Sequence, residues 1–284
     1  MKIKAIILSL ILIIIFLTGF IFWQRAAILK KRRGPPPARR VSTPKVAEKK
    51  ERVSRRPAVK ARKFKNPRVA IVMDDFGYNM NNLEELFSIR QPVTLSILPS
   101  LRYSRRIADI AVAHGYEIIL HLPMEAHNKD IREEEGTIRC GMAKEEVIAL
   151  LDKDIAGVPG LKGVSNHMGS KATEDRGLME IVLKYLKKRR LYFFDSFTSQ
   201  KSVGSDVARA EGLRSAKRDI FLDNLNDFDY IEKQMWVLKK FAFARGRAIA
   251  ICHDRRNTVR ALKKLMPDMA KDGIIFVYLS ELVK

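Results

Sequence analysis

The stretch Val69-Ala-Ile-Val-Met-Asp-Asp-Phe-Gly-Tyr78 sets the architecture that we expect of this chain. Five apolar residues run straight into two adjacent carboxylates, Asp74 and Asp75, and Gly77 suits the sharp turn that follows. A short apolar run that ends in a turn residue is typical of a buried parallel strand. In α/β proteins the chemistry lies at the carboxyl ends of such strands, so the Asp pair is a candidate metal or acid–base site. The alternative interpretation is a helix N-cap, since Asp caps helices well.

Strand-like and helix-like segments alternate from residue 68 onward. The expected strands are residues 69–73, 93–98, 117–120, 162–165, 191–194, 219–222, 248–252 and 273–278. The expected helices are residues 81–89, 103–114, 143–156, 174–189, 226–245 and 256–270. Such alternation predicts an α/β fold with a mostly parallel sheet. Seven or eight units favour a distorted or incomplete (β/α) barrel over residues 68–284, and an open doubly wound sheet is the alternative.

The formal net charge of +22 is concentrated before this region. Residues 24–68 contain 18 Lys and Arg against two Glu. They also include Gly34-Pro-Pro-Pro37 and few large apolar side chains, so residues 24–67 are expected to form a disordered linker. The rest of the chain is ordinary in charge, which argues against nucleic acid as its partner.

Residues 5–23 are an almost uninterrupted apolar run, long enough to cross a bilayer as a helix. Trp23 at its end suits the interfacial aromatic belt. We predict a short flank at residues 1–4 followed by an uncleaved signal anchor, with a cleaved signal peptide as the alternative. The membrane is therefore an expected partner, through this helix and through the basic linker. Both flanks are basic, so charge alone does not orient the span.

Polar side chains that bind metals well follow several of the expected strands. They are Asp74 and Asp75, His121, Asn166 and His167, Asp195, and His253 with Asp254. In a parallel sheet these strand ends share one face, so the side chains are expected to surround one pocket. One carboxylate and two imidazoles are a common ligand set for a catalytic divalent metal, which leaves a second Asp as base and a third His as acid.

Other classes of site lack their signature in this sequence. No Gly-rich nucleotide loop precedes a helix, and no Gly-x-Ser-x-Gly elbow is present. Cys140 and Cys252 form no metal motif. Asn166 and the Gly169–Ser170 turn are candidate donors to an oxyanion.

Seven segments, in this order, resemble the divergent branch of the polysaccharide deacetylases. They are Ile71–Gly77, Leu95–Pro99, Ile119–Glu125, Gly163–Ser170, Phe193–Ser196, Ile220–Asp223 and Ala248–His253. The resemblance implies a distorted (β/α) barrel that removes acetyl groups from an envelope polysaccharide with the help of a divalent metal. It also implies a single-pass protein of the cytoplasmic membrane whose catalytic domain lies on the extracytoplasmic side.

The resemblance also implies a metal centre. In the well-studied deacetylases the second Asp of the strand-end pair is a ligand, which here is Asp75. Two histidines four residues apart complete that set, and this chain has His121 and Glu125 in their places. His167 is the expected replacement ligand. Zinc is the metal expected from these ligand types, with iron, cobalt and nickel as alternatives.

The remaining roles follow the same resemblance. Asp74 is the expected catalytic base, His253 the general acid, and Asp195 the residue that orients one of them. Glu125, Asn166 and Ser170 are expected to contact the substrate. Two other functions stay open, namely a non-catalytic carbohydrate-binding or envelope scaffold protein and a metal-dependent phosphoesterase.

Overall fold

The computed structural model describes residues 64–130 and 132–284. The predicted flank, signal anchor and nearly all of the predicted linker lie outside these residues and stay predictions. Within the described part, no helix combines the length and the apolar character that a bilayer crossing requires.

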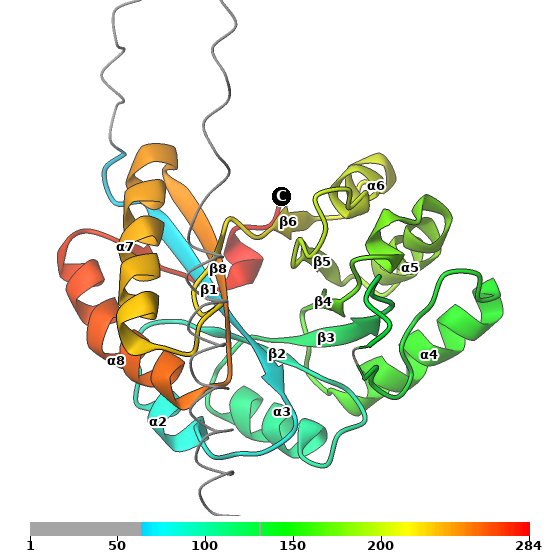
Figure 1. Cartoon of the computed structure of the whole chain (residues 1–284), viewed down its shortest axis with the longest axis horizontal. Coiled ribbons are helices and arrows are strands. Elements are labelled where there is room, and N and C mark those ends of the chain that lie inside the picture. The colour runs from blue at the N-terminus through cyan, green and yellow to red at the C-terminus, as the bar shows by residue number, and fades with distance from the viewer. Residues whose placement is uncertain (1–63, 131) are drawn as a thin grey trace, which may run out of the picture. The chain divides into compact units, whose positions relative to one another are not determined.

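The described residues alternate between strands and helices (Figure 1). The strands are β1 (Arg68–Phe76), β2 (Thr94–Ile97), β3 (Ile118–Met124), β4 (Gly163–Met168), β5 (Tyr192–Asp195), β6 (Ser215–Lys217), β7 (Ile220–Phe221), β8 (Arg247–His253) and β9 (Ile275–Phe276). The α-helices are α2 (Leu83–Phe87), α3 (Ser104–Ala113), α4 (Lys144–Gly157), α5 (Arg176–Lys188), α6 (Gly204–Glu211), α7 (Phe228–Arg245) and α8 (Arg256–Lys271). Two 3-10 turns are η1 (Ala172–Glu174) and η2 (Leu279–Glu281).

The sheet is parallel and curls on itself. Its strand order is β6-β5-β4-β3-β2-β1-β8-β7, and β9 pairs with the start of β1. β6 and β7 stand at opposite ends of this order, yet only Arg218 and Asp219 separate them in the sequence. The two edges of the sheet must therefore lie near each other. The prediction of a parallel, barrel-like α/β fold is confirmed, and the open doubly wound alternative is wrong.

Strand β1 is central because it is buried on both of its faces. Val69, Ile71 and Met73 belong to the core between the sheet and the helices, whereas Ala70 and Val72 belong to the core inside the sheet. Successive side chains of a strand point to opposite faces, so a strand covered on both sides must be apolar throughout. This explains the uninterrupted apolar run at residues 69–73.

The carboxy-terminal residues close one end of the barrel. Val277, Leu279, Leu282 and Val283 belong to the inner core together with β1 and β8 side chains. The backbone of Lys284 exchanges hydrogen bonds with Ser215 at the start of β6. This end carries the amino ends of the strands, so the opposite end remains for the site.

One strand and one α-helix were not predicted. Strand β6 has the sequence Ser-Ala-Lys, which contains no apolar run. Helix α6 begins with Gly204 and, besides that glycine, buries only Val207 and Ala208. Both are held by their neighbours, since β6 pairs with β5 and α6 packs on α5.

Candidate metal centre

The Asp pair lies at the carboxyl end of β1, where the strand is irregular. The pairing of β1 with β2 shifts register between Met73 and Phe76, and Asp75 has a left-handed backbone with φ of 67°. Asp is among the residues that tolerate this conformation. A bulge breaks the alternation of side chains along a strand, so both adjacent carboxylates face the same site. The pair caps no helix, because α2 begins only at Leu83.

His121 comes from β3 and is buried. Its Nδ1 lies 2.9 Å from Ser165 Oγ, which lies 2.9 Å from Ser96 Oγ. This hydrogen-bond chain fixes the ring and leaves Nε2 facing the Asp pair. The Nε2 atom is 3.4 Å from Asp75 Oδ1 and 3.7 Å from Asp74 Oδ2.

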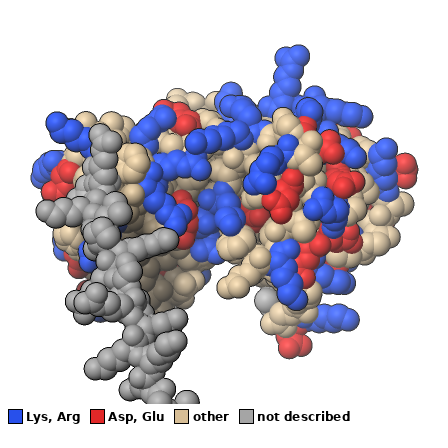
Figure 2. All heavy atoms as spheres, turned by 90° about the horizontal axis from the view of Figure 1, so that it is seen from above, with Lys and Arg blue, Asp and Glu red and all other residues tan. Residues whose placement is uncertain are grey.

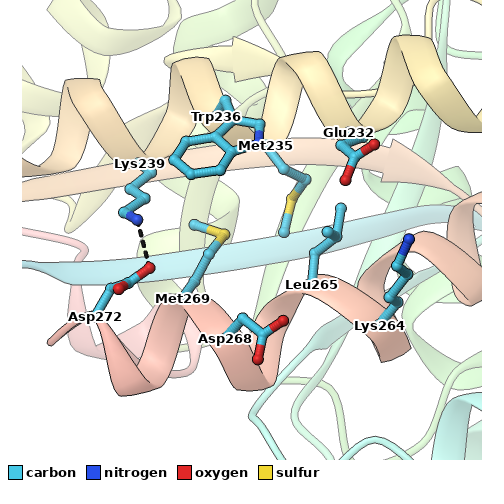
Figure 3. A pocket seen from close by; sticks show the side chains of 9 residues that line it. All are labelled: Glu232, Met235, Trp236, Lys239, Lys264, Leu265, Asp268, Met269 and Asp272. Atoms are coloured by element: carbon cyan, nitrogen blue, oxygen red, sulfur yellow. Dashed lines mark hydrogen bonds and ion pairs between the residues drawn. The ribbon is translucent and has the colours of Figure 1, made fainter.

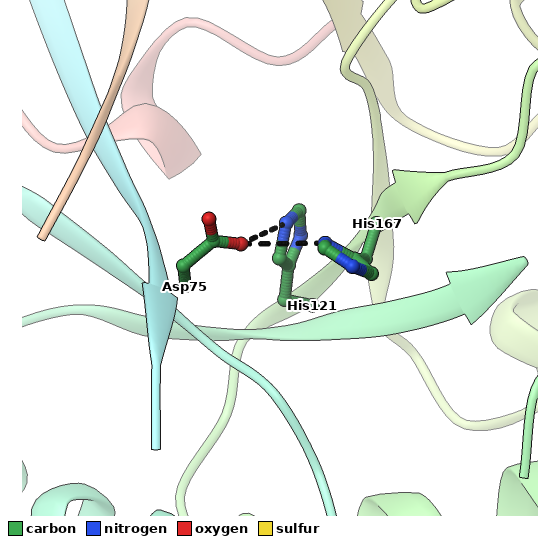
Figure 4. A group of neighbouring side chains, drawn as sticks. All are labelled: Asp75, His121 and His167. Atoms are coloured by element: carbon green, nitrogen blue, oxygen red, sulfur yellow. Dashed lines mark ion pairs between the residues drawn. The ribbon is translucent and has the colours of Figure 1, made fainter. Parts of the chain in front are cut away.

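His167 comes from the next strand, β4, and completes a group of three. Its Nδ1 atom lies 3.3 Å from Asp75 Oδ1, and its ring meets the ring of His121 edge to face at 4.8 Å. One ligand atom each from Asp75, His121 and His167 lies within 4.8 Å of the others. Figure 4 shows the three side chains converging from separate strands. The structure thus brings together the three residues that the sequence analysis selects as ligands, and their role as ligands stays a prediction.

The Asp75 carboxylate fits a metal ligand. Its Oδ1 atom is buried and has no hydrogen-bond partner among the described residues, although two imidazole nitrogens lie within 3.4 Å. A buried carboxylate oxygen without a partner is costly, and a divalent cation would remove that cost. Burial works to raise the pKa of Asp75, but His121 and His167 outweigh it and hold the pKa well below its usual range. The carboxylate is therefore ionised, as a ligand must be.

Asp74 behaves in the opposite way. It is buried, and its Oδ1 atom also lacks a hydrogen-bond partner among the described residues. Burial raises the pKa of Asp74, and the charge of Asp75 adds to this effect against that of His121. Two neighbouring carboxyls whose pKa values are pushed apart are suited to different roles. The geometry thus allows Asp75 to bind a cation while Asp74 exchanges protons.

His253 at the end of β8 faces the pair from the other side. Its Nε2 atom lies 3.7 Å from Asp75 Oδ2, and its Nδ1 atom lies 2.9 Å from Asp223 Oδ1. Burial works to lower the pKa of His253, but the hydrogen bond and the charge of Asp223 outweigh it and raise the pKa. The imidazole is therefore held in one orientation and favoured in its protonated form.

Asp223 is the site residue that the sequence analysis did not select. Its carboxylate also accepts hydrogen bonds from the His253 backbone N–H and from Thr258 Oγ1, at 2.9 and 2.8 Å. Asp223 directly follows the expected strand at 219–222, so the strand-end rule that selected the other residues would have found it. Its side chain is fully buried, which fits a positioning role rather than contact with a substrate.

Asp195 lies at the end of β5 but has other contacts. Its carboxylate accepts hydrogen bonds from Ser202 Oγ at 2.7 Å and from the Phe197 backbone N–H at 2.8 Å. Within the described residues it has no hydrogen bond to Asp74 or His253. The expected contact to the general acid is made by Asp223 instead, and Asp195 holds the loop between β5 and α6.

The residues expected to bind the substrate are also engaged elsewhere. The carboxylate of Glu125 contacts Lys171 Nζ at 2.7 Å and accepts the Cys140 backbone N–H at 2.9 Å. Ser170 Oγ accepts the His127 backbone N–H at 3.0 Å. Both side chains therefore connect loops at the rim of the sheet.

Asn166 requires a correction. It is fully buried, its Oδ1 accepts the Ser196 backbone N–H at 2.9 Å, and its Nδ2 donates to Met168 O at 2.7 Å and to Thr198 Oγ1 at 3.4 Å. Both N–H groups of the amide are used inside the protein. Asn166 is thus a structural residue, and the expectation that it donates to an oxyanion is wrong.

A well-formed pocket elsewhere does not coincide with this chemistry. It has a volume of about 180 Å³ and lies between α7 and α8 (Figure 3). Its lining residues are Glu232, Met235, Trp236, Lys239, Lys264, Leu265, Asp268, Met269 and Asp272. None of the predicted site residues lines it, and the strand-end cluster remains the candidate site.

Comparison with known proteins gives relatives across the same region. The chain is 33% identical over 209 residues to an uncharacterized protein of Haemophilus influenzae, and the matched region covers 74% of each chain. It is 32% identical over 205 residues to the uncharacterized protein YibQ of Escherichia coli, and the matched region covers 72% of this chain and 64% of that one.

A solved structure shares the fold. It is that of the uncharacterized protein ATU2773 from Agrobacterium tumefaciens C58, with a TM-score of 0.74 at 25% identity over 78% of this chain and 93% of that one. A family profile described as divergent polysaccharide deacetylase matches residues 71–283. The chain belongs to the divergent polysaccharide deacetylase family.

Proposed function

We propose that the domain is a metal-dependent hydrolase that removes acetyl groups from an envelope carbohydrate. The observation that carries this proposal is the buried Asp75 Oδ1 atom, which lies near the imidazoles of His121 and His167 and has no hydrogen-bond partner in the described part of the chain. Family membership supports the substrate class. Zinc is the proposed metal, since one carboxylate and two imidazoles leave positions open for water and substrate.

The chemistry divides among the residues of the site. When bound, a divalent cation supplies a Lewis acid for the acetyl carbonyl and lowers the pKa of water. Asp74, with its raised pKa, accepts the proton of the attacking water. His253, held protonated by Asp223, donates a proton to the departing amine or alcohol.

The proposed location follows from the sequence. The apolar residues 5–23 would hold the chain in the cytoplasmic membrane, and the domain would lie on the extracytoplasmic side, where an envelope glycan is found. Accessibility of the domain to an added protease in intact spheroplasts tests this placement. Protection of the domain in intact spheroplasts and its digestion only after their lysis would contradict it.

Acetate release from acetylated glycan fragments tests the proposed reaction. The metal-loaded protein should release acetate, and Asp74→Asn and His253→Asn should each lower the rate by about 10²–10⁴-fold with the metal retained. Asp109→Asn, which removes an exposed carboxylate on α3, is the control and should keep full activity.

Two results would contradict the proposal. Release of phosphate from model esters without release of acetate would identify a phosphoesterase. Binding of glycan fragments by the metal-loaded protein, with release of neither product, would identify a non-catalytic carbohydrate-binding protein.

A further inference from the structure

The end of the barrel opposite the metal centre carries an excess of Lys and Arg over Asp and Glu. We name this end the basic face. It comprises the residues that lead into β1, the carboxy-terminal segment, and the connections that lead from each helix to the next strand. Each connection is counted from the last two residues of the helix to the first residue of the strand. These ranges are 64–68, 86–94, 112–118, 156–163, 187–192, 210–215, 244–247, 270–275 and 277–284. They contain 13 Lys and Arg against four Asp and Glu.

The excess of basic residues on the basic face accounts for the net positive charge of the whole domain. Residues 64–284 carry 36 Lys and Arg against 30 Asp and Glu, a net charge of +6. The basic face has a net charge of +9, so the remainder of the domain has a net charge of −3. The net positive charge of the domain therefore comes from this end of the barrel, because acidic residues outnumber basic ones in the remainder.

The basic side chains of this face are directed to solvent. Twelve of the thirteen are exposed, and the thirteenth, Arg68, is half-buried and pairs with Glu281. Glu117, one of the four acids, is buried inside the barrel. The densest part is Lys187-Lys-Arg-Arg190 at the end of α5. Figure 2 shows Lys and Arg side chains spread across one side of the molecule, with Asp and Glu side chains among them on the right of the view.

Exposed apolar side chains lie among these charges. Phe64, Val112 and Ile275 are 52%, 45% and 48% exposed, and all three belong to the basic face. Large apolar residues surrounded by Lys and Arg are typical of surfaces that bind at the headgroup level of a bilayer.

The chain also enters the domain from this face. The Phe64 backbone N–H donates to Phe243 O near the end of α7, at 2.9 Å. The 63 residues that precede it carry a net charge of +16 and include the apolar run at residues 5–23. If that run anchors the chain, it keeps the domain close to a bilayer.

We propose that the basic face docks on a bilayer surface that contains anionic headgroups, so that the metal centre points away from the membrane. Each Lys or Arg near such a surface contributes attraction that falls off within a Debye length. The rest of the domain, with its net charge of −3, offers no such attraction. This inference goes beyond acetyl hydrolysis, because it concerns where the domain sits and holds for any reaction at the site.

Hydrogen exchange on the full chain in nanodiscs tests this docking. One set of nanodiscs contains phosphatidylcholine only, and the other contains about 30% phosphatidylglycerol. In the anionic set, backbone amides of residues 187–192 and 270–276 should exchange several-fold more slowly, and those of the strand-end loop at 197–202 should not change. The slowing should disappear in about 0.5 M salt.

A matched pair of variants separates docking from a general charge effect. Replacing Lys187, Lys188, Arg189 and Arg190 by Glu should remove the slowing at 270–276, a segment that the variant does not alter. Replacing four exposed basic residues outside the face, Lys129, Lys201, Arg256 and Arg260, by Glu gives the same change of charge and should keep it.

Several outcomes would overturn the proposal. The first is equal exchange in both sets of nanodiscs, and the second is equal loss of protection in both variants. The third is that the soluble polyanion heparin protects these segments in neutral nanodiscs whereas anionic lipid does not. Retention of the chain by nanodiscs after a high-salt wash tests the anchor separately, and acetate release tests the hydrolase separately.

Discussion

Asp154 on α4 is expected to make the stability of the domain fall as pH rises. Its side chain is 1% exposed, and neither carboxylate oxygen has a hydrogen-bond partner among the described residues. Burial raises the pKa of Asp154 to about 7 from its usual 3.8, with Lys153 opposing and Glu135 adding to the shift. A carboxyl that ionises less readily in the folded state costs stability progressively as pH rises from 3.8 to 7 and fully above 7.

The size of this cost follows from the shift. A rise of about three pKa units corresponds to a loss of about 4 kcal/mol of unfolding free energy at pH 8. This is an upper value, because local opening of the structure lets water reach the carboxylate. Asp154→Asn keeps the shape and removes the charge. The variant should therefore gain free energy of unfolding over the native protein at pH 8 and show nearly the same value at pH 4.

Urea unfolding between pH 4 and pH 8 measures the difference. A chelator in all samples keeps metal binding out of the comparison, and Asp109→Asn, at an exposed position on α3, serves as the control. The gain of Asp154→Asn should grow with pH, and the control should show no such trend. An Asp154→Asn protein that is less stable than the native one at pH 8, or equally stable at every pH, would refute the reasoning.

Three further predictions concern the site. Ser165→Ala removes the partner of His121 Nδ1 and should weaken metal affinity by about 10- to 100-fold, measured by competition with a chromophoric chelator; unchanged affinity would contradict the orienting role. Asp223→Asn removes the charge that raises the pKa of His253. Activity is lost as pH rises through that pKa, so the variant should lose activity at a lower pH than the native protein in a profile of kcat/KM. An alkaline limb at the same pH in both proteins would contradict the role of Asp223. Asn166→Ala leaves the Ser196 N–H without its partner, whereas Met168 O keeps Thr198 Oγ1 as a donor, so the variant should lose about 1–3 kcal/mol of unfolding free energy with little change in metal affinity; the reverse pattern would return Asn166 to the site.

The elements with apolar runs were predictable from sequence. Strands β1, β3 and β8 are covered on both faces, so each contains an apolar run that makes its position evident. Strand β6 and helix α6 have few apolar residues and exist because β5 and α5 offer them partners. Local sequence does not contain that information.

The candidate site was predictable to the level of strand ends but not of contacts. The rule that polar residues at parallel strand ends meet is sufficient to bring together Asp75, His121 and His167. It does not distinguish a side chain that faces the pocket from one that is used inside the protein, which is why Asn166 and Glu125 were assigned to the substrate. Those assignments depend on loops whose paths the strand pattern does not determine.

The direction of the Asp pair was also beyond the sequence. In a regular strand Asp74 and Asp75 would point to opposite faces, and only the bulge with its left-handed Asp75 turns both toward the site. Asp223, by contrast, was accessible to the strand-end rule. Its contact with His253 shows that the expected partner of the general acid comes from the strand beside β8 rather than from β5.

The central claim is that Asp75, His121 and His167 hold one divalent metal ion. Anomalous diffraction at the zinc edge, from crystals of the zinc-loaded protein, tests it most directly. We predict one peak, with Asp75 Oδ1, His121 Nε2 and His167 Nδ1 at about 2.0–2.2 Å from the ion, and no peak at this place in Asp75→Ala crystals. A peak held by other residues, or no peak between these three side chains at saturating zinc, would contradict the account.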